Sequence, residues 1–272
     1  MINKVCVISL GTVGLPTAEY IYSHGFEVYG YDIRPKRSCK FRITTNWNDI
    51  PHDDIDIYVI TVSTGWDHIN NVPDLSALYD VCSNIARAKK ALISIESTVP
   101  IGTCRSIANK YGFKLVVHVP HRYWSGDPIN RGVKQLRVFG ALNEESKKIG
   151  LDFYKRLEIP LFVVSNIEIA EMCKVLENAY RFTQIAFAEE AKMICDALGL
   201  NFEEVRKACN TKWNIDILEA REGIGGHCLP KDIRYMIYHA KQVSIDAHLL
   251  QAAVTADEIY KRCIKKKADA HV

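Results

Sequence analysis

The segment Gly223-Ile-Gly-Gly-His-Cys-Leu-Pro-Lys-Asp232 gathers residue types that could carry out covalent chemistry. Its glycines allow the backbone to approach a substrate closely and to hold strained angles. Cys228 is predicted to stand at the start of a helix, where the helix dipole and Lys231 favour the nucleophilic thiolate. Asp232 could orient a water or act as a base. A cysteine taken alone is more often a small buried hydrophobe, so the catalytic interpretation depends on the residues around it.

Lys174 and Asn178 stand four residues apart in a stretch with helical periodicity. They therefore share one face of the predicted helix. Such a pair suits holding a substrate oxygen, or a water, and stabilising charge on it as hydride leaves. The alternative is that Lys174 is simply exposed to solvent, as lysines on long helices usually are.

A second candidate site lies where a predicted strand turns into a helix, at Ser9-Leu-Gly-Thr-Val-Gly14. Dinucleotide-binding turns place glycines here so that a pyrophosphate can sit on the helix N-terminus. In this interpretation Gly11 lets the backbone approach the phosphates and Gly14 permits close packing of the helix. Ser9 occupies the position of the usual first glycine. The predicted cofactor contacts in the turn are Gly11, Thr12, Val13 and Gly14.

Asp32 ends the second predicted strand, where a carboxylate meets the ribose hydroxyls of a dinucleotide. Because a carboxylate repels a 2′-phosphate, NAD is favoured over NADP. Arg34 and a further predicted cofactor contact, Arg37, keep NADP open, since arginines accommodate that phosphate. A Rossmann-like fold that binds no dinucleotide is the remaining alternative.

Short β-branched runs alternate with helical stretches in the first half of the chain, which predicts a Rossmann-like parallel α/β sheet. Beyond Val164, residues 167–198 contain no proline or glycine and predict one long helix. Shorter helices are predicted over 202–209 and 231–240, and a final long one over 246–266. We therefore expect an NAD-binding Rossmann domain over residues 1–165 and an all-helical dimerisation and substrate domain over 166–272.

The composition excludes several other classes of protein. A net charge of +3 is too small to indicate a nucleic-acid partner. There is neither an apolar run long enough to span a bilayer nor a signal peptide, so a cytoplasmic location is expected. The nine cysteines include no Cys-x-x-Cys pair and predict neither a metal site nor a disulfide framework.

Several segments together resemble those of the UDP-glucose/GDP-mannose dehydrogenases, which oxidise the primary alcohol of a sugar nucleotide to a carboxylate. The resemblance covers nearly the whole chain. The segments that carry it are Gly11-Thr-Val-Gly-Leu-Pro16, Glu96-Ser-Thr-Val-Pro-Ile-Gly-Thr103, Glu171-Met-Cys-Lys-Val-Leu-Glu-Asn178 and Gly223 to Asp232. The last of them is the most specific, since a glycine loop that presents a cysteine ahead of Pro-Lys-Asp is rarely seen elsewhere.

The resemblance implies roles for the candidate residues. Cys228 would trap the intermediate aldehyde as a thiohemiacetal, and a second hydride transfer would give a thioester that water hydrolyses. Thr98 would lie beside the nicotinamide and the catalytic water, and Thr64 at another position on the cofactor side; a plain loop hydroxyl is the alternative for Thr64. Lys231 is a further predicted cofactor contact. The resemblance also implies a nucleotide-sugar substrate and a homodimer built across the helical domains.

The sequence departs from the family pattern in places. His118-Val-Pro-His-Arg122 stands where the family usually has Pro-Glu-Arg, so His121 occupies the place of a catalytic glutamate. A histidine can act as a base near neutral pH, and His121 is therefore kept among the catalytic candidates. Glu189 replaces an asparagine customary just before Glu190.

Family members also continue past the final predicted helix into a second Rossmann-like domain that binds the nucleotide. Three explanations are open for this chain: a truncation, a partner chain that supplies the missing half, or a smaller or different substrate.

Two other functions remain open beside the double oxidation through Cys228. One is a two-electron dehydrogenase of the β-hydroxyacid type, which would use Lys174 and Asn178 and need no cysteine. The other is a catalytically silent subunit that binds NAD or depends on a partner chain.

Overall fold

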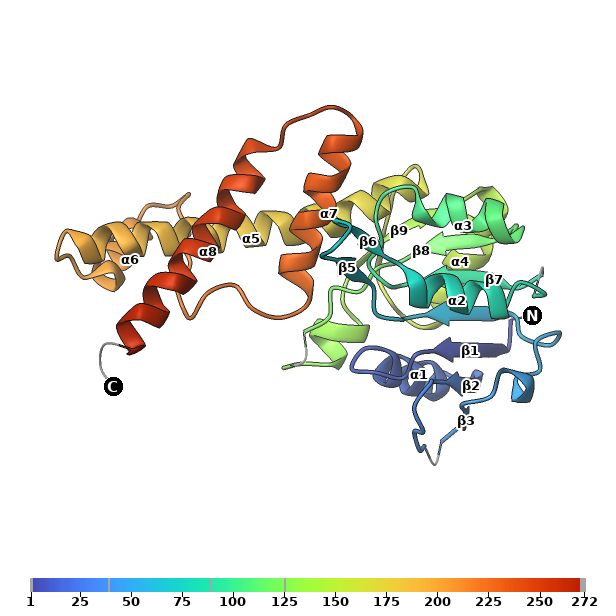
Figure 1. Cartoon of the computed structure of the whole chain (residues 1–272). Helices are drawn as coiled ribbons and strands as arrows, with labels where there is room; N and C mark the ends of the chain where they lie inside the picture. Colours follow the sequence, from blue (N-terminus) through green and yellow to red (C-terminus); the bar gives the residue numbers. More distant parts are fainter. Residues whose placement is uncertain (1, 39, 89, 125, 270–272) are drawn as a thin grey trace. The chain divides into compact units, whose positions relative to one another are not determined.

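The computed structural model describes the backbone of residues 2–38, 40–88, 90–124 and 126–269, and the side chains of these residues up to 266. The chain forms two compact units, Met1–Lys174 and Val175–Val272 (Figure 1). The helix α5, Ile167–Ala197, belongs to both.

The first unit is built on an eight-stranded sheet in the order β10-β9-β8-β7-β4-β1-β2-β3. The predicted Rossmann-like sheet is confirmed, with one difference: β9 runs antiparallel to β8, while every other neighbouring pair is parallel. The strands are β1 Lys4–Ile8, β2 Glu27–Tyr31, β3 Arg42–Thr44, β4 Ile57–Ile60, β7 Leu92–Ile95, β8 Val116–His118, β9 Arg137–Ala141 and β10 Leu161–Val163. A small hairpin of β5 Gly65–Asp67 and β6 Val72–Asp74 follows β4. Neither β3 nor this hairpin was predicted, because their short polar segments carry no strand periodicity.

Helices cover both faces of this sheet. One core contains Cys6 and Ile8 of β1 together with residues of α2, Ser76–Asn84, and α3, Thr103–Tyr111. The other contains Val5 and Val7 with residues of α1 and α4. Successive β1 side chains thus point into opposite cores, which explains why the strand is apolar throughout instead of alternating. The bounds of the second pair of helices are α1 Gly14–Ser23 and α4 Glu144–Arg156.

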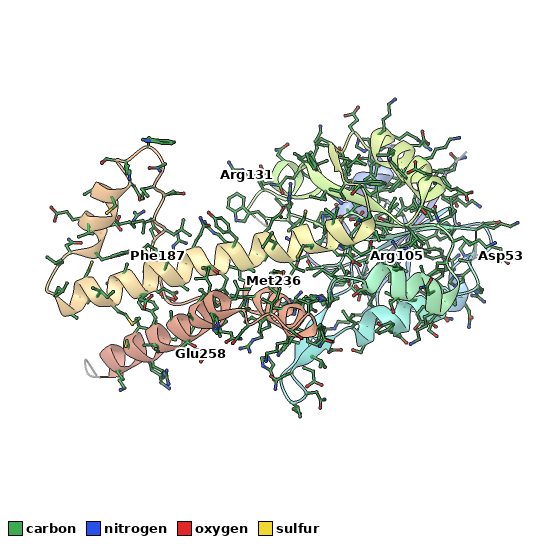
Figure 2. All side chains as sticks on the ribbon, turned by 90° about the horizontal axis from the view of Figure 1, so that it is seen from above. Asp53, Arg105, Arg131, Phe187, Met236 and Glu258 are labelled. Atoms are coloured by element: carbon green, nitrogen blue, oxygen red, sulfur yellow. The ribbon has the colours of Figure 1, made fainter. Side chains whose placement is uncertain are left out.

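The second unit is helical, as predicted. It consists of the later part of α5, which is a single unbroken helix (Figure 2), with α6 Phe202–Cys209, α7 Cys228–Gln242 and α8 His248–Asp269. Helix α7 begins three residues before the predicted start, so Cys228 lies in its first turn. Pro230 is compatible with this earlier start, because the first turn of a helix tolerates proline. Among the residues that the structure describes, no helix is long and apolar enough to cross a membrane.

Candidate active site

The turn between β1 and α1 has the shape that a pyrophosphate requires. Ser9 has a φ of +73°, a left-handed conformation that favours glycine. A Cβ on Gly14 would lie 1.8 Å from the Ser9 carbonyl oxygen, so only glycine fits there. A Cβ on Gly11 would meet nothing within 4 Å, so open space lies in front of the turn. The exposed Thr12 and half-buried Val13 complete a loop that leads into the N-terminus of α1.

Asp32 lies at the carboxyl end of β2, and the backbone fixes its side chain. Its Oδ2 accepts the N–H of Leu10 at 2.7 Å, and its Oδ1 accepts the N–H of Arg34 at 2.8 Å. A carboxylate has further lone pairs, so it can still accept ribose hydroxyls. A cavity of about 340 Å³ adjoins it, lined among others by Tyr31, Ile33 and Val62. Together with the open space at Gly11, this cavity fits NAD.

Arg37, the other predicted contact near the ribose, is exposed in the irregular segment before β3. The structure gives it no contact that would distinguish NAD from NADP.

Thr64 and Thr98 lie together at the carboxyl ends of β4 and β7. The Thr64 hydroxyl donates a 2.6 Å hydrogen bond to the Thr98 carbonyl, and Ser97 Oγ donates one of 2.7 Å to the Val62 carbonyl. The two loops are therefore tied to each other. The structure thus gives Thr64 a positioning contact with Thr98, in addition to its predicted place on the cofactor side.

Glu171 on α5 fixes the other end of the Thr98 loop. Its carboxylate accepts the N–H of Gly102 at 2.5 Å and of Cys104 at 2.7 Å, at the N-terminus of α3. Burial raises the pKa of Glu171 to about 7, although these backbone hydrogen bonds act in the opposite direction. The sequence placed Glu171 in a family motif without assigning it this role.

His121 lies in a buried polar cluster of the first unit. Its Nε2 contacts the carboxylate of Glu96, which also accepts a 2.9 Å hydrogen bond from Arg137 and a 2.5 Å bond from the Tyr154 hydroxyl. Burial acts to raise the pKa of Glu96, but the charge of Arg137 and the hydrogen bonds outweigh it and hold that pKa at about 2.

Burial and the charges of Arg137 and Lys174 lower the pKa of His121 to about 4, so its imidazole is neutral near pH 7. Its Nδ1 has no hydrogen-bond partner among the described residues. A neutral imidazole oriented by a carboxylate can accept a proton, but a pKa this far below 7 makes His121 a weaker base than an ordinary histidine. The sequence placed His121 at a catalytic position but did not identify Glu96, Arg137 or Tyr154 as its partners.

In the second unit, three of the predicted residues form one hydrogen-bonded chain. The amide of Asn178 on α5 donates a 2.5 Å hydrogen bond to Oδ2 of Asp232, and the ammonium of Lys231 donates one of 2.5 Å to Oδ1. Asp232 is fully buried, whereas Cys228, one turn earlier on α7, is exposed. Cys228 and Asp232 are four residues apart, so they share a face of α7. The ammonium of Lys231 therefore contacts the Asp232 carboxylate rather than remaining in solvent.

Lys174 lies one turn before Asn178 on α5, and the two share a face of that helix. It is half-buried, so it differs from the exposed lysine that was the alternative interpretation.

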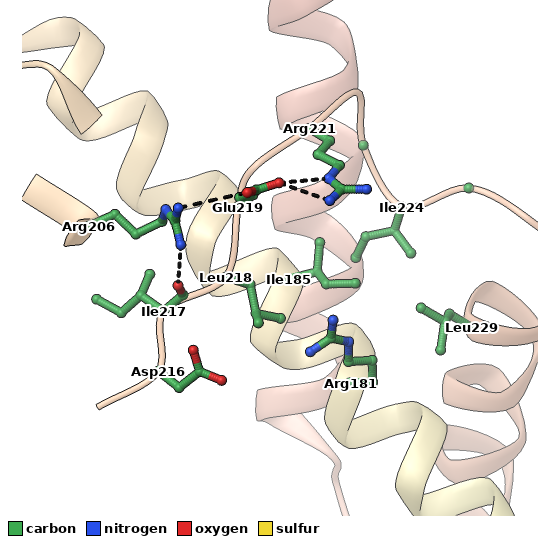
Figure 3. Close-up of a pocket in the computed structure, with 12 residues that line it drawn as sticks. Arg181, Ile185, Arg206, Asp216, Ile217, Leu218, Glu219, Arg221, Ile224 and Leu229 are labelled. Carbon is green, nitrogen blue, oxygen red and sulfur yellow. Dashed lines mark hydrogen bonds and ion pairs between the residues drawn. The ribbon is translucent and has the colours of Figure 1, made fainter. Parts of the chain in front are cut away.

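A cavity of about 460 Å³, the arginine cavity, adjoins the start of α7 (Figure 3). Arg181, Arg206 and Arg221 line it together with Asp216 and Glu219, and Leu229 and the backbone of the glycine loop lie at one side. Arg206 and Arg221 both contact Glu219, and Arg206 also pairs with Glu203. Arg181 makes no hydrogen bond or ion pair with a described residue. Guanidinium groups bind phosphates through paired hydrogen bonds, so this cavity suits an anionic ligand.

Two parts of the chain match the domains of one protein family. Residues 36–158 match the NAD-binding domain of the UDP-glucose/GDP-mannose dehydrogenase family, and residues 168–258 match its central domain. The chain belongs to this family. The predicted family and its NAD-binding domain are thereby confirmed, whereas the dehydrogenase activity and the roles of individual site residues stay predictions.

Similar proteins are nucleotide-sugar dehydrogenases. The UDP-N-acetyl-D-mannosamine dehydrogenase of Methanococcus vannielii is 32% identical over 87% of this chain, and the NDP-N-acetyl-D-galactosaminuronic acid dehydrogenase of Ralstonia nicotianae is 28% identical over 92%. The chain spans 61% of the length of the Methanococcus protein.

The solved structure of the Pyrococcus horikoshii UDP-D-ManNAc dehydrogenase is 29% identical, with a TM-score of 0.83 over 94% of this chain and 68% of that one. The 3-hydroxyisobutyrate dehydrogenase of Mycobacterium tuberculosis, at 13% identity and a TM-score of 0.73, covers 96% of this chain and 94% of that one and shows a shared fold alone.

Proposed function

We propose that this chain carries the NAD-binding and catalytic part of a dehydrogenase that oxidises the primary alcohol of a nucleotide sugar to a carboxylate through Cys228. The observation that supports this best is the buried chain of Asn178, Asp232 and Lys231 beside the helix turn that presents Cys228. A buried carboxylate that binds both an amide and an ammonium holds those two groups in fixed positions. Fixed polar groups next to an exposed thiol suit covalent catalysis better than a structural role.

The proposed chemistry needs two oxidations. NAD, which Gly11, Gly14 and Asp32 would hold, would supply the hydride acceptor for both oxidations, and the hydroxyl proton lost in each would pass to water. Between the two, the Cys228 thiolate forms a C–S bond with the aldehyde carbon while the aldehyde oxygen takes a proton. After the second oxidation, water attacks the thioester, the C–S bond breaks, and the carboxylate and thiolate separate.

Each of the remaining candidates has a role in this proposal. Lys174 and Asn178 hold the substrate oxygen and stabilise its charge. Asp232 keeps the Asn178 amide oriented. His121, neutral and oriented by Glu96, is the base for the hydrolytic water.

The arginine cavity supports a substrate that carries phosphate. Arg181 offers a guanidinium with no partner among the described residues, and the cavity lies against the glycine loop and Leu229. A phosphate group would pair with this guanidinium. The names of the relatives make UDP-N-acetyl-D-mannosamine the first sugar nucleotide to test.

The surface of α5 supports a homodimer. Large apolar side chains recur along it at intervals of four and seven residues and are 50–64% exposed, a stripe made up of Leu176, Tyr180, Phe187 and Ile194; Leu198, directly after the end of the helix, is 67% exposed. Figure 2 shows Phe187 on this helix. Helical residues with this spacing lie on one face. A second copy of the chain presents the same stripe, so a two-fold pairing buries both.

The proposal is tested by counting NADH per molecule of limiting substrate over a panel of UDP-sugars, GDP-sugars and small hydroxy acids. We expect two NADH per nucleotide sugar, loss of the second oxidation in Cys228→Ala, and no change in Cys209→Ala, since Cys209 is another exposed cysteine of the same unit. One NADH, or turnover of a hydroxy acid alone, would favour the two-electron alternative. Binding of NAD by calorimetry without turnover would favour a silent or partner-dependent subunit.

A further inference from the structure

Three backbone groups of the segment ahead of Cys228 form hydrogen bonds with side chains of helix α8. The Asp257 carboxylate accepts the N–H of Ile224 at 2.7 Å, and the Lys261 ammonium donates to the Ile224 carbonyl at 2.6 Å. The Tyr260 hydroxyl donates to the Arg221 carbonyl at 2.7 Å. Lys261 also contacts Asp257 at 2.8 Å, so the two side chains that bind Ile224 stabilise each other.

The groups that make these contacts are buried, apart from the Lys261 side chain, which is 42% exposed. Asp257 is 4% exposed, Tyr260 2% and Ile224 3%. Gly223 has a φ of +93°, and a Cβ there would lie 2.6 Å from the methylene carbons of Lys261. The lysine stem therefore packs directly on the glycine while its ammonium binds the next residue. Buried hydrogen bonds to charged groups are stronger than exposed ones, so this contact is firm.

The loop needs such an anchor because of its composition. Three of the four residues from Gly223 to Gly226 are glycines, and glycine loses more conformational freedom on folding than any other residue. A loop of this kind is mobile unless other elements fix it. The same loop lines the arginine cavity and ends two residues before Cys228.

We propose that Asp257, Tyr260 and Lys261 are positioning residues, which fix the glycine loop so that Cys228 and the cavity keep one geometry. This inference rests on the proposed function of Cys228 and extends it to α8, whose side chains were assigned no part in the reaction.

The first test reads the loop itself. Deuterium uptake is measured by mass spectrometry in a peptide covering residues 221–228 of the full chain. Lys261→Met keeps most of the lysine stem but removes the ammonium, and we expect exchange of the Ile224 amide about tenfold faster, because local opening follows the loss of a half-buried charged hydrogen bond. Lys265→Met, one turn further along α8 at an exposed position, is the matched control and should exchange as the unmodified chain does. Equal uptake in Lys261→Met and Lys265→Met would overturn the proposal.

A second pair of variants separates positioning from folding. In Asp257→Asn the amide oxygen can still accept the Ile224 N–H, so exchange should stay close to that of the unmodified chain, whereas Asp257→Ala should raise it about tenfold. If Asp257→Ala does not fold, Tyr260→Phe keeps the ring and removes only the bond to Arg221. It should then raise exchange of the 221–228 peptide by a smaller factor, and unchanged exchange there would count against the proposal.

The third readout is kinetic. Lys261→Met should lower kcat for the second oxidation about tenfold and leave the KM for NAD unchanged, because the dinucleotide turn and Asp32 lie in the first unit, whereas the glycine loop belongs to the second. Faster exchange with an unchanged kcat would show that α8 orders the loop without positioning Cys228. That result would overturn the role proposed for α8 but not the proposed function. Full double oxidation by Cys228→Ala would instead overturn the proposed function, and the exchange data would still report the anchor.

Discussion

The amide of Asn178 lies 2.5 Å from the carboxylate of Asp232, a residue 54 positions away in the chain, and this bond joins α5 to α7. The other carboxylate oxygen binds Lys231. One buried negative charge thus neutralises an ammonium and orients an amide at the same time. Both helices depend on it, and so does the candidate site.

Replacing Asp232 by asparagine should therefore damage stability as well as activity. The variant keeps the size of the side chain but removes the carboxylate that pairs with the buried Lys231 ammonium, and breaking a buried ion pair costs about 3–5 kcal/mol. Asn178→Ala leaves the ion pair intact and should cost only about 1–3 kcal/mol while lowering kcat on the order of 100-fold. Urea unfolding and steady-state kinetics on both variants check this. Equal stability of the two would show that the ion pair is not the stronger contact.

Ser9→Gly should stabilise the chain. The left-handed conformation at Ser9 costs an L-residue about 1–2 kcal/mol, and the greater freedom of glycine in the unfolded chain offsets part of that gain, leaving about 0.5–1 kcal/mol. Ser9→Ala retains a Cβ and should give no gain. Urea unfolding of the two variants measures the difference, and a gain in both would contradict an origin in backbone strain.

Glu189 should make the stability of the chain depend on pH. It is fully buried, and neither carboxyl oxygen has a hydrogen-bond partner among the described residues. Burial, together with the nearby charge of Asp257, raises its pKa from 4.5 to about 7, although Lys261 acts in the opposite direction. Below pH 4.5 the carboxyl is protonated both folded and unfolded. As pH rises from about 4.5 to about 7 the unfolded chain releases this proton first, so stability falls, by on the order of 3 kcal/mol in total.

Glu189→Gln removes this titration. The variant should match the unmodified chain near pH 4 and exceed its free energy of unfolding at pH 8, as measured by urea unfolding across the range. An equal pH slope in both proteins would place the titration elsewhere. Glu190→Gln, at the exposed neighbouring position, is the control.

The homodimer should depend on the apolar stripe of α5. Phe187→Glu places a charge in the middle of the stripe, and burying it unpaired would cost several kcal/mol, so the chain should become a monomer in light scattering. Phe162→Glu changes an equally exposed phenylalanine on β10 and should leave the mass unchanged. A monomeric unmodified chain would contradict the proposed dimer outright.

Much of this protein could be predicted from local patterns in the sequence. The absence of proline and glycine over 167–198 gave α5 almost to the residue, and the turn at Gly11 and Gly14 indicated the dinucleotide site. Asn178, Lys231 and Asp232 were candidates because their spacing and motifs carry chemistry. Helical periodicity and turn chemistry depend on residues close in sequence, which is why they can be read there.

The partners of those residues depended on the tertiary structure. Nothing near His121 in the sequence points to Glu96 or Arg137, and nothing near Ile224 points to Asp257 and Lys261 on α8. The antiparallel placement of β9 also depended on pairing between distant segments. A buried charge is stabilised by whichever group the fold brings beside it, over separations of 25 to 41 residues in these cases. The sequence by itself therefore determined which side chains could act and which elements bear them. The packing of those elements decided which charged groups meet, because such pairs depend on contacts between distant segments that leave no local pattern in the sequence.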